Sequence, residues 1–211
     1  MKVLVLGAHS DDSVLGCGGT MARLSQEKNI IWEVIFTNGA KYPPWKLNNI
    51  KLIKERKSEA KKASKILGVK KTIFFNINDT EIKKNIEESV PKLVKILKKF
   101  NPERVYVHHE KDMHTDHASV FKILSLALIK VETKPEIYGY EVNSWFNFIQ
   151  KPDTLQVICD ITSTYSTKLK ALEVFKSQQT LIKPLKKILQ IKGLYYGLTS
   201  GKNHTETFFK Y

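Results

Sequence analysis

The stretch Lys2-Val-Leu-Val-Leu-Gly-Ala-His-Ser-Asp-Asp-Ser13 sets the expected fold of this chain. Its first part, Lys2 to Leu6, is a short apolar run that ends at Gly7, a pattern that strands buried on both faces show. Two later runs, Ile31 to Phe36 and Val105 to Val107, repeat it. The chain therefore begins with an interior strand of a sheet, and polar residues follow at the carboxyl end of that strand.

Helical patterns alternate with these strands. Apolar residues recur three and four positions apart in four segments: Val14 to Gln26, Asn49 to Leu67, Ile82 to Lys99 and Ala118 to Val131. Gly68 follows the second segment, where a C-terminal cap is expected. Further strands are predicted over Thr72 to Phe75, Glu136 to Tyr140 and Leu155 to Cys159. Such alternation predicts an α/β fold: a Rossmann-like, doubly wound, mostly parallel sheet with helices on both faces.

Length and composition suit one domain. A chain of 211 residues that is 42% hydrophobic can bury a core with a cleft beside it, so we expect a single domain over residues 1–211. The least regular segments are Asn38 to Asn48 and the tail after Leu181. Both are expected to be loops that wall a cleft.

The sequence predicts a cytoplasmic protein. No apolar run approaches the roughly 20 residues that span a bilayer, and no cleavable signal pattern follows Met1. Cys17 and Cys159 are too few to staple a secreted scaffold and lack metal-ligand spacing. The oligomeric state stays open, with a homo-oligomer as one option.

The formal charge of +14 raises the alternative of a nucleic-acid or anion-binding module. The excess is nearly all lysine, and only Arg23, Arg56 and Arg104 could make bidentate contacts with bases or phosphates. Many of the lysines fall on predicted helix faces: Lys54, Lys57, Lys61, Lys62 and Lys65. A solvated surface without a specific nucleic-acid partner is therefore the favoured interpretation.

The turn after the first strand favours a metal ion over a phosphate. Nucleotide-binding sheets place a glycine-rich turn there, whereas this chain has Gly7-Ala-His-Ser-Asp-Asp-Ser13. Two carboxylates would repel a phosphate and attract a cation. Gly16, Gly18 and Gly19 come too late in the chain to form a phosphate-binding turn.

A second group of His and Asp residues, His108-His-Glu-Lys-Asp-Met-His-Thr-Asp-His117, follows the predicted strand Val105 to Val107. If this strand and the first one are neighbours, their carboxyl ends flank the crevice where ligands bind in doubly wound sheets. We therefore expect the two groups to converge there.

Two histidines and one carboxylate with an open fourth position form a hydrolytic zinc site, because zinc lowers the pKa of a bound water to roughly 7. His9, Asp12 and His117 are the predicted ligands. Iron is the alternative metal, since the same ligand set serves oxygenases.

The neighbouring polar residues suggest the other roles. Asp11 is left as the general base for the water, and His114 lies one helical turn before His117, where it can face the oxyanion or protonate the leaving amine. Asp116 could orient His114 or a ligand. The structural alternative is that the Asp pair only caps a helix and that the histidines are surface or capping residues.

At these residues the sequence resembles the PIG-L/LmbE-like family of zinc-dependent N-acetylglucosaminyl deacetylases. The family has an Ala-His-Pro-Asp-Asp-Glu turn and a later His-x-Asp-His, which read here Ala8-His-Ser-Asp-Asp-Ser13 and His114-Thr-Asp-His117. Similarity is also present in weaker motifs spread over most of the chain: Arg56-Lys-Ser-Glu-Ala60, Leu67-Gly68, Asp160-Ile-Thr162 with Lys168, and Ser177-Gln178.

The resemblance implies the same ligands, base and oxyanion residue. It also implies that Arg56 contacts a substrate hydroxyl or phosphate; the alternative is a salt bridge with Glu59 or Glu55 on the same helix. Two residues depart from the motif, Ser10 for the usual proline and Ser13 for the usual glutamate. Neither is a proposed ligand.

The expected function is the removal of an N-acetyl group from an amino sugar or sugar conjugate by zinc-activated water. Two alternatives stay open: the lysine-rich binding module, and a metal hydrolase acting on another bond such as a phosphoester. The latter more often employs two metals, and His108, His109, Glu110 and Asp112 could supply the second site. Otherwise, His108 and His109 are expected to lie nearer the substrate than the zinc.

Overall fold

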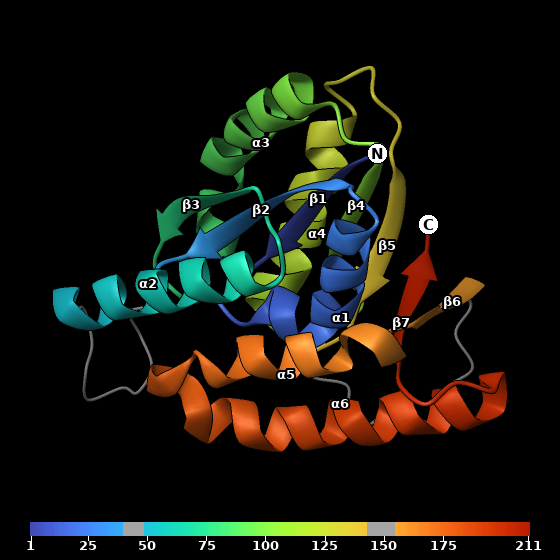
Figure 1. Cartoon of the computed structure of the whole chain (residues 1–211). Helices are drawn as coiled ribbons and strands as arrows, with labels where there is room; N and C mark the ends of the chain where they lie inside the picture. Colours follow the sequence, from blue (N-terminus) through green and yellow to red (C-terminus); the bar gives the residue numbers. More distant parts are fainter. Residues whose placement is uncertain (40–48, 143–154) are drawn as a thin grey trace.

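The computed structural model describes residues 1–39, 49–142 and 155–211, which form a seven-stranded sheet with helices on both faces (Figure 1). The strands are β1 (Lys2–Gly7), β2 (Ile30–Thr37), β3 (Lys71–Ile77), β4 (Arg104–His108), β5 (Glu136–Tyr140), β6 (Leu155–Asp160) and β7 (Thr205–Lys210). The helices are α1 (Asp12–Gln26), α2 (Ile50–Ile66), α3 (Ile86–Phe100), α4 (Thr115–Leu128), α5 (Tyr165–Glu173) and α6 (Gln179–Ser200). Short 3₁₀ turns are η2 (Ile82–Asn85), η3 (Thr162–Thr164) and η4 (Lys176–Gln178).

The strand order is β3-β2-β1-β4-β5-β7-β6. Strands β1 to β5 pair in parallel, and β7 runs antiparallel to both β5 and β6. The order changes direction between β1 and β4, which are neighbours as expected. The predicted doubly wound, mostly parallel sheet is therefore confirmed.

Strand β1 lies between two apolar cores, which explains its uninterrupted apolar sequence. Val3 and Val5 face the core built with α1, α2, α5 and α6, whereas Leu4 and Leu6 face the core built with α3 and α4. All four side chains are fully buried. Because successive side chains of a strand point to opposite faces, a strand covered on both sides needs apolar residues at every position.

The predicted helices are found with small shifts at their ends. The Asn49 side chain caps α2 by accepting hydrogen bonds from the backbone of Lys51 and Leu52, and Gly68 follows α2 with a φ of +77°, which favours glycine. The predicted helix Ile82 to Lys99 is a 3₁₀ turn followed by α3. Across the described ranges, no helix is both long and apolar enough to cross a membrane.

The tail after Leu181 is not the loop that we expected, because α6 and β7 occupy it. Pro184, Gly193 and Gly197 weaken its helical pattern, but each glycine has a packing reason. A Cβ at Gly193 would lie 2.7 Å from the Thr205 carbonyl oxygen, and one at Gly197 would lie 2.6 Å from that of Lys202. The chain can therefore turn back against α6 and insert β7 into the sheet. Of the other expected loop, residues 40–48 lie outside the described part of the chain.

Helix α1 is kinked at Cys17, where φ is −141° and ψ is 20°. The kink frees the backbone N–H groups of Gly19 and Thr20, which donate to the Glu206 carboxylate over 2.9 and 2.7 Å. On the other side of the kink, Lys168 Nζ donates to the Leu15 carbonyl and to Glu206, both over 2.7 Å. The buried ion pair of Lys168 and Glu206 thus satisfies the free backbone groups on both sides of the kink, and it ties α1 to α5 and β7.

Candidate active site

The two His and Asp groups meet at the carboxyl ends of β1 and β4, as expected from their positions in the sequence. His9, Asp11 and Asp12 of the first group and His114 and His117 of the second line a cleft of about 380 Å³, the size of a small-molecule site. The cleft is lined by His9, Ser10, Asp11, Asp12, Gly39, Arg56, Asp79, Thr80, His114, His117, Val142, Gln178, Leu181 and Leu185. The first turns of α6 therefore form one wall, although this segment is a helix and not a loop.

His9, Asp12 and His117 can point ligand atoms at a common position, since these atoms all lie within 4.8 Å of one another. Asp12 Oδ2 is 3.3 Å from His9 Nδ1 and 3.4 Å from His117 Nε2. Burial alone would raise the pKa of Asp12, but the His117, His9 and His108 rings hold it well below its usual range. Asp12 is therefore a carboxylate, as a metal ligand must be.

The second ring nitrogen of each histidine faces another carboxylate. His9 Nε2 is 3.3 Å from Asp116 Oδ2, and His117 Nδ1 is 2.9 Å from Asp112 Oδ2. Metal-binding histidines usually donate their other N–H group to a carboxylate or carbonyl, which orients the ring and makes it a better ligand. The residues present therefore fit a divalent metal ion such as zinc.

Asp116 is itself held by the loop after β3. Its carboxylate accepts the backbone N–H of Thr80 over 2.6 Å and that of Ile82 over 3.3 Å. Thr80 has a φ of +67°, a conformation that costs energy for a β-branched residue. The strained Thr80 thus donates the hydrogen bond that fixes the Asp116 carboxylate against His9.

Asp11 does not act as a simple helix cap. It occupies the N-cap position of α1, yet its side chain makes no capping hydrogen bond. It is buried and lines the cleft. Burial and the nearby Asp12 charge raise the pKa of Asp11 to about 6, against the opposing effects of His9 and Arg56. A carboxyl group with this pKa can exchange a proton near neutral pH.

His114 is set up as a neutral hydrogen-bond donor. Its Nδ1 accepts the backbone N–H of Asp116 over 3.2 Å, so the ring proton of the neutral form is on Nε2. Burial and the nearby His117 lower the pKa of His114 below its usual value. A neutral imidazole that lines the cleft can donate to a developing oxyanion.

Arg56 also reaches the cleft. Its guanidinium group is buried and donates to the Gly39 carbonyl. The Glu59 carboxylate, one of the two alternative partners, accepts the N–H and Oγ–H groups of Ser177, and the charges of Glu59 and Glu55 both act on Arg56. Arg56 thus lines the cleft, within electrostatic reach of the Asp79 and Asp11 carboxylates.

His108 and His109 do not lie where we expected them. His108 is fully buried behind Asp12, where its Nε2 accepts the Ala8 N–H over 3.0 Å, and it does not line the cleft. His109 packs its ring against Phe209. The expectation that both lie nearer the substrate than the metal ligands is wrong, because the end of β4 turns these side chains into the protein interior.

Three further features of the site were missed. Asp112 faces His117, Asp79 lines the cleft from the end of β3, and the Ser10 Oγ–H group donates to Gln178 Oε1 over 2.7 Å. Asp79 follows a predicted strand, so the same reasoning that singled out the ends of β1 and β4 could have found it. Gln178 belongs to the weak Ser177-Gln178 motif, but nothing local in the sequence links it to Ser10, which is 168 residues away.

The chain matches known proteins along most of its length. The model of the PIG-L family, described as GlcNAc-PI de-N-acetylase, matches residues 4–128. An uncharacterized deacetylase of Escherichia coli, YaiS, is 35% identical over 83% of this chain and 90% of its own length.

Solved structures share the fold. An N,N'-diacetylchitobiose deacetylase from Pyrococcus horikoshii superposes with a TM-score of 0.80 at 27% identity, covering 100% of this chain and 83% of its own. GalB, a 4-carboxy-2-hydroxymuconate hydratase from Pseudomonas putida, has a TM-score of 0.83 at 23% identity and covers 99% and 95%. The hydratase shows the fold alone. With the family model matching more than half of its residues, this chain belongs to the PIG-L family.

Proposed function

We propose that this protein is a zinc-dependent hydrolase that removes the N-acetyl group from an amino sugar or sugar conjugate, with His9, Asp12 and His117 as the metal ligands. The observation that carries the proposal is the carboxylate behind each histidine, Asp116 at His9 and Asp112 at His117. A turn with only a structural role would not need two oriented histidines and a further buried carboxyl group beside them.

Each of the other residues has a step in this reaction. When bound, a zinc ion would polarise the amide carbonyl and make a coordinated water acidic near neutral pH. Asp11 accepts a proton from the attacking water at a carboxylate oxygen, and His114 donates from Nε2 to the carbonyl oxygen as negative charge builds there. The C–N bond then breaks, and Asp11 or His114 gives a proton to the leaving amine. The products are acetate and a free amino sugar.

The proposed substrate class rests on the relatives and on the polar groups of the cleft. The Pyrococcus horikoshii relative is a deacetylase of diacetylchitobiose. In this chain, Arg56 and Asp79 line the cleft beside the candidate metal ligands. A guanidinium and a carboxylate provide donors and acceptors for sugar hydroxyl groups.

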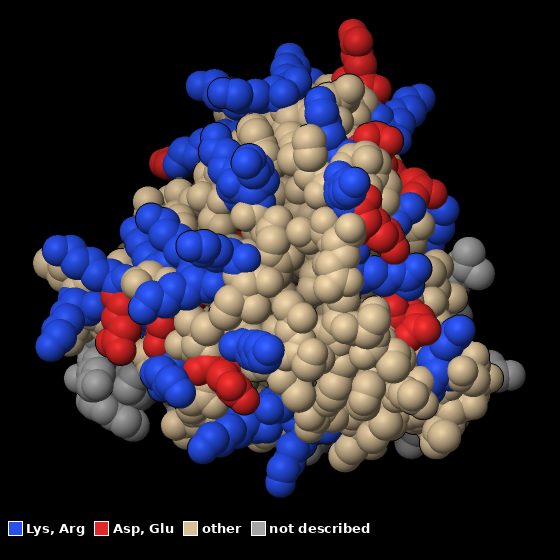
Figure 2. All heavy atoms as spheres, viewed as in Figure 1, with Lys and Arg blue, Asp and Glu red and all other residues tan. Residues whose placement is uncertain are grey.

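Two other functions have less support. His108, Asp112 and His117 also bring ligand atoms within 4.8 Å, which a two-metal phosphoesterase could use. This group shares His117 with the first and includes the fully buried His108, so it would not face the cleft. For a nucleic-acid module, Figure 2 shows Lys and Arg spread over the visible face with Asp and Glu between them, which supports a solvated surface.

Metal analysis combined with an acetate-release screen tests the proposal. The panel contains N-acetylated monosaccharides, chito-oligosaccharides, sugar nucleotides and glycolipid head groups, with phosphomonoesters and phosphodiesters as the competing class. We expect zinc and not iron, about one ion per chain, and acetate release from at least one N-acetyl sugar. Phosphate release, or two metals per chain, would instead support the phosphoesterase.

A further inference from the structure

Ser10 makes a contact that the proline of the family motif could not make. Its hydroxyl group donates to Gln178 Oε1 over 2.7 Å, and both residues line the cleft. Ser10 is 7% exposed and Gln178 is 5% exposed, so the hydrogen bond is protected from water. Ser10 comes from the turn that carries His9 and Asp11, whereas Gln178 precedes the first turn of α6.

This contact leaves the other half of the Gln178 amide available. With Oε1 occupied by Ser10, the two N–H groups on Nε2 have no hydrogen-bond partner among the described residues. Nε2 is also not one of the side-chain atoms that are sealed from solvent without a partner. In a residue that is otherwise buried and lines the cleft, the open direction for Nε2 is the cleft.

We infer that Gln178 is a substrate-binding residue of the proposed deacetylase and that Ser10 positions it. Its Nε2 group donates to an oxygen of the sugar, a hydroxyl or a ring or glycosidic oxygen, while the acyl carbonyl faces His114 and the metal ligands. This inference rests on the proposed function for the identity of the substrate. It adds a specificity-determining residue to that site.

The chemistry of the amide supports selection between sugars. A buried donor that loses its substrate acceptor is left unpaired, so a site built around such a donor rejects the analogue that lacks the acceptor. Leu181 and Leu185 follow Gln178 at helical spacing and line the same cleft. The wall formed by α6 therefore presents one polar contact beside an apolar surface.

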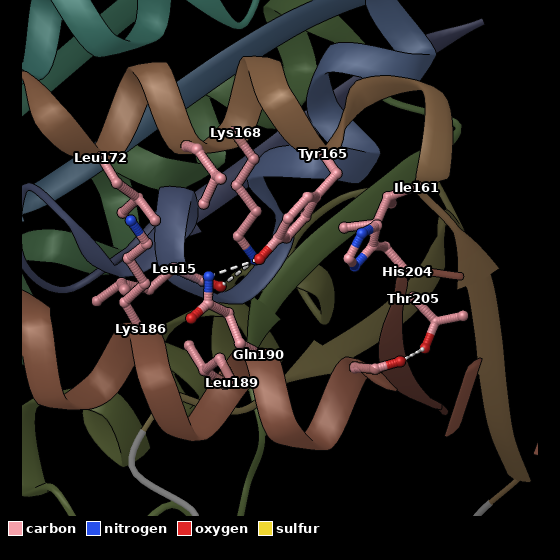
Figure 3. Close-up of a pocket in the computed structure, with 12 residues that line it drawn as sticks. Leu15, Ile161, Tyr165, Lys168, Leu172, Lys186, Leu189, Gln190, His204 and Thr205 are labelled. Carbon is pink, nitrogen blue, oxygen red and sulfur yellow. Dashed lines mark hydrogen bonds between the residues drawn. The ribbon is translucent and has the colours of Figure 1, made fainter. Parts of the chain in front are cut away.

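Gln178→Leu removes the donor at nearly constant volume, and Gln190→Leu is the matched control. Gln190 lies on α6, the helix that follows Gln178, but its Nε2 donates to Tyr165 Oη over 2.6 Å in a small cavity between α5 and α6 (Figure 3). We expect Gln178→Leu to raise the KM for an N-acetyl sugar about three- to tenfold, the loss of one neutral hydrogen bond, with a smaller change in kcat. Gln190→Leu should leave both unchanged.

A panel of N-acetylglucosamine and its 3-, 4- and 6-deoxy analogues identifies the contact. The wild type should turn over one deoxy analogue less efficiently than N-acetylglucosamine. Gln178→Leu should lose this difference and keep the wild-type preferences among the other analogues. Alone, Ser10→Ala should reduce the same discrimination. Combined with Gln178→Leu, it should have no further effect. If Gln178→Leu and Gln190→Leu keep the wild-type profile, the inference is overturned while the deacetylase stands.

Binding measured without turnover separates the proposed Gln178 contact from the proposed deacetylation. Saturation-transfer NMR with N-acetylglucosamine reports binding even if no acetate is released. Wild-type binding that Gln178→Leu weakens, without acetate release from any N-acetyl sugar, would support the contact and reject the proposed reaction. An absence of wild-type binding, together with an absence of turnover, would overturn both.

Discussion

His9 and His117 owe their orientation to two carboxylates that are not themselves ligands. Asp116 faces the second nitrogen of His9, and Asp112 faces that of His117. Residues that orient metal ligands in this way usually change metal affinity by 10- to 100-fold, roughly, when they are replaced. The proposed metal site therefore extends to residues that ligand spacing alone does not identify.

Asp112→Asn tests this extension. We expect zinc affinity to fall by roughly 10- to 100-fold, because the amide orients His117 without increasing its basicity. Competition with a chromogenic chelator measures the change. Glu110→Gln, an exposed position in the same loop, is the control; equal affinities for both variants would remove Asp112 from the site.

Ser13 also departs from the family motif, and the structure gives it a partner. The Ser13 and Ser64 hydroxyl groups each donate to the buried Glu33 carboxylate over 2.5 Å, and Thr72 donates over 3.4 Å. Burial nevertheless raises the pKa of Glu33 above its usual value. A carboxylate from β2 therefore contacts position 13, where the family motif has a glutamate of its own.

Ser13→Ala should destabilise the protein more at pH 8 than at pH 5. The folded-state pKa of Glu33 is above its unfolded value, so the ionisation of Glu33 costs stability as pH rises above about 4.3. Removing one donor to the ionised form adds about 1–3 kcal/mol to this cost. Urea unfolding at both pH values measures the difference. The role of Glu33 would be contradicted if Ser13→Ala lost the same stability at both pH values. It would also be contradicted if the loss caused by Ser13→Ala stayed pH-dependent in a Glu33→Gln background.

The positions of the residues at the centre of the candidate site could be predicted from the sequence, because each residue directly follows or begins an element with a clear sequence pattern. His9, Asp11 and Asp12 follow one buried strand directly, and His114 and His117 begin the helix after another. Gln178 and Asp112 could not be assigned, since their roles depend on partners that only the folded chain brings near. His108 was misplaced because sequence position does not tell which side of the sheet a residue at the end of a strand faces.

At the scale of elements, α1 depends on contacts from the far end of the chain. Lys168 and Glu206, both buried, satisfy the backbone groups on either side of the kink at Cys17. The first half of α1 carries Asp12 and follows Asp11, so the kink separates the candidate metal-binding turn from the rest of the helix. The C-terminal strand thus supports the N-terminal part of the site.

Glu206→Gln should cost roughly 3–5 kcal/mol of stability, because it leaves the Lys168 ammonium buried without its counter-charge. Urea unfolding measures the loss. In the double variant Lys168→Met/Glu206→Gln, the loss should be smaller than in Glu206→Gln alone. The control is Lys202→Met, in the more exposed pair with Asp160, which should change stability by less than about 1 kcal/mol. A Glu206→Gln variant as stable as this control would contradict the role of the pair.

Strands β1 to β6 and helices α1 to α4 could be predicted because each has a regular apolar pattern. The end of the chain could not, for two physical reasons. In α6, Gly193 and Gly197 are selected by close contact with the chain that follows, which lowers helix propensity. Strand β7 pairs with β5 and β6 in antiparallel fashion, and its sequence Thr-Glu-Thr-Phe-Phe-Lys lacks the apolar run that marks the interior strands.

In the described part of the molecule, residues that follow β1, β2, β3, β4 and β5 all line one cleft, with Gly39 after β2 and Val142 after β5. The β1 and β4 ends supply the candidate ligands, and the β3 end supplies Asp79 and the loop that holds Asp116. The change in strand direction between β1 and β4 creates the crevice, as in other doubly wound sheets. The net charge of +14 gives the molecule a general attraction for anions, which adds to the site without defining it.

In the proposed mechanism Asp11 moves the proton while His9, Asp12 and His117 hold the metal, and the two variants Asp11→Asn and His117→Ala test these roles directly. Zinc content and acetate release are measured on the same samples, with the best N-acetyl sugar of the screen. We expect Asp11→Asn to keep its zinc and lose turnover by roughly 10²- to 10⁴-fold, and His117→Ala to lose both. Wild-type turnover in Asp11→Asn, or full zinc content in His117→Ala, would contradict the account.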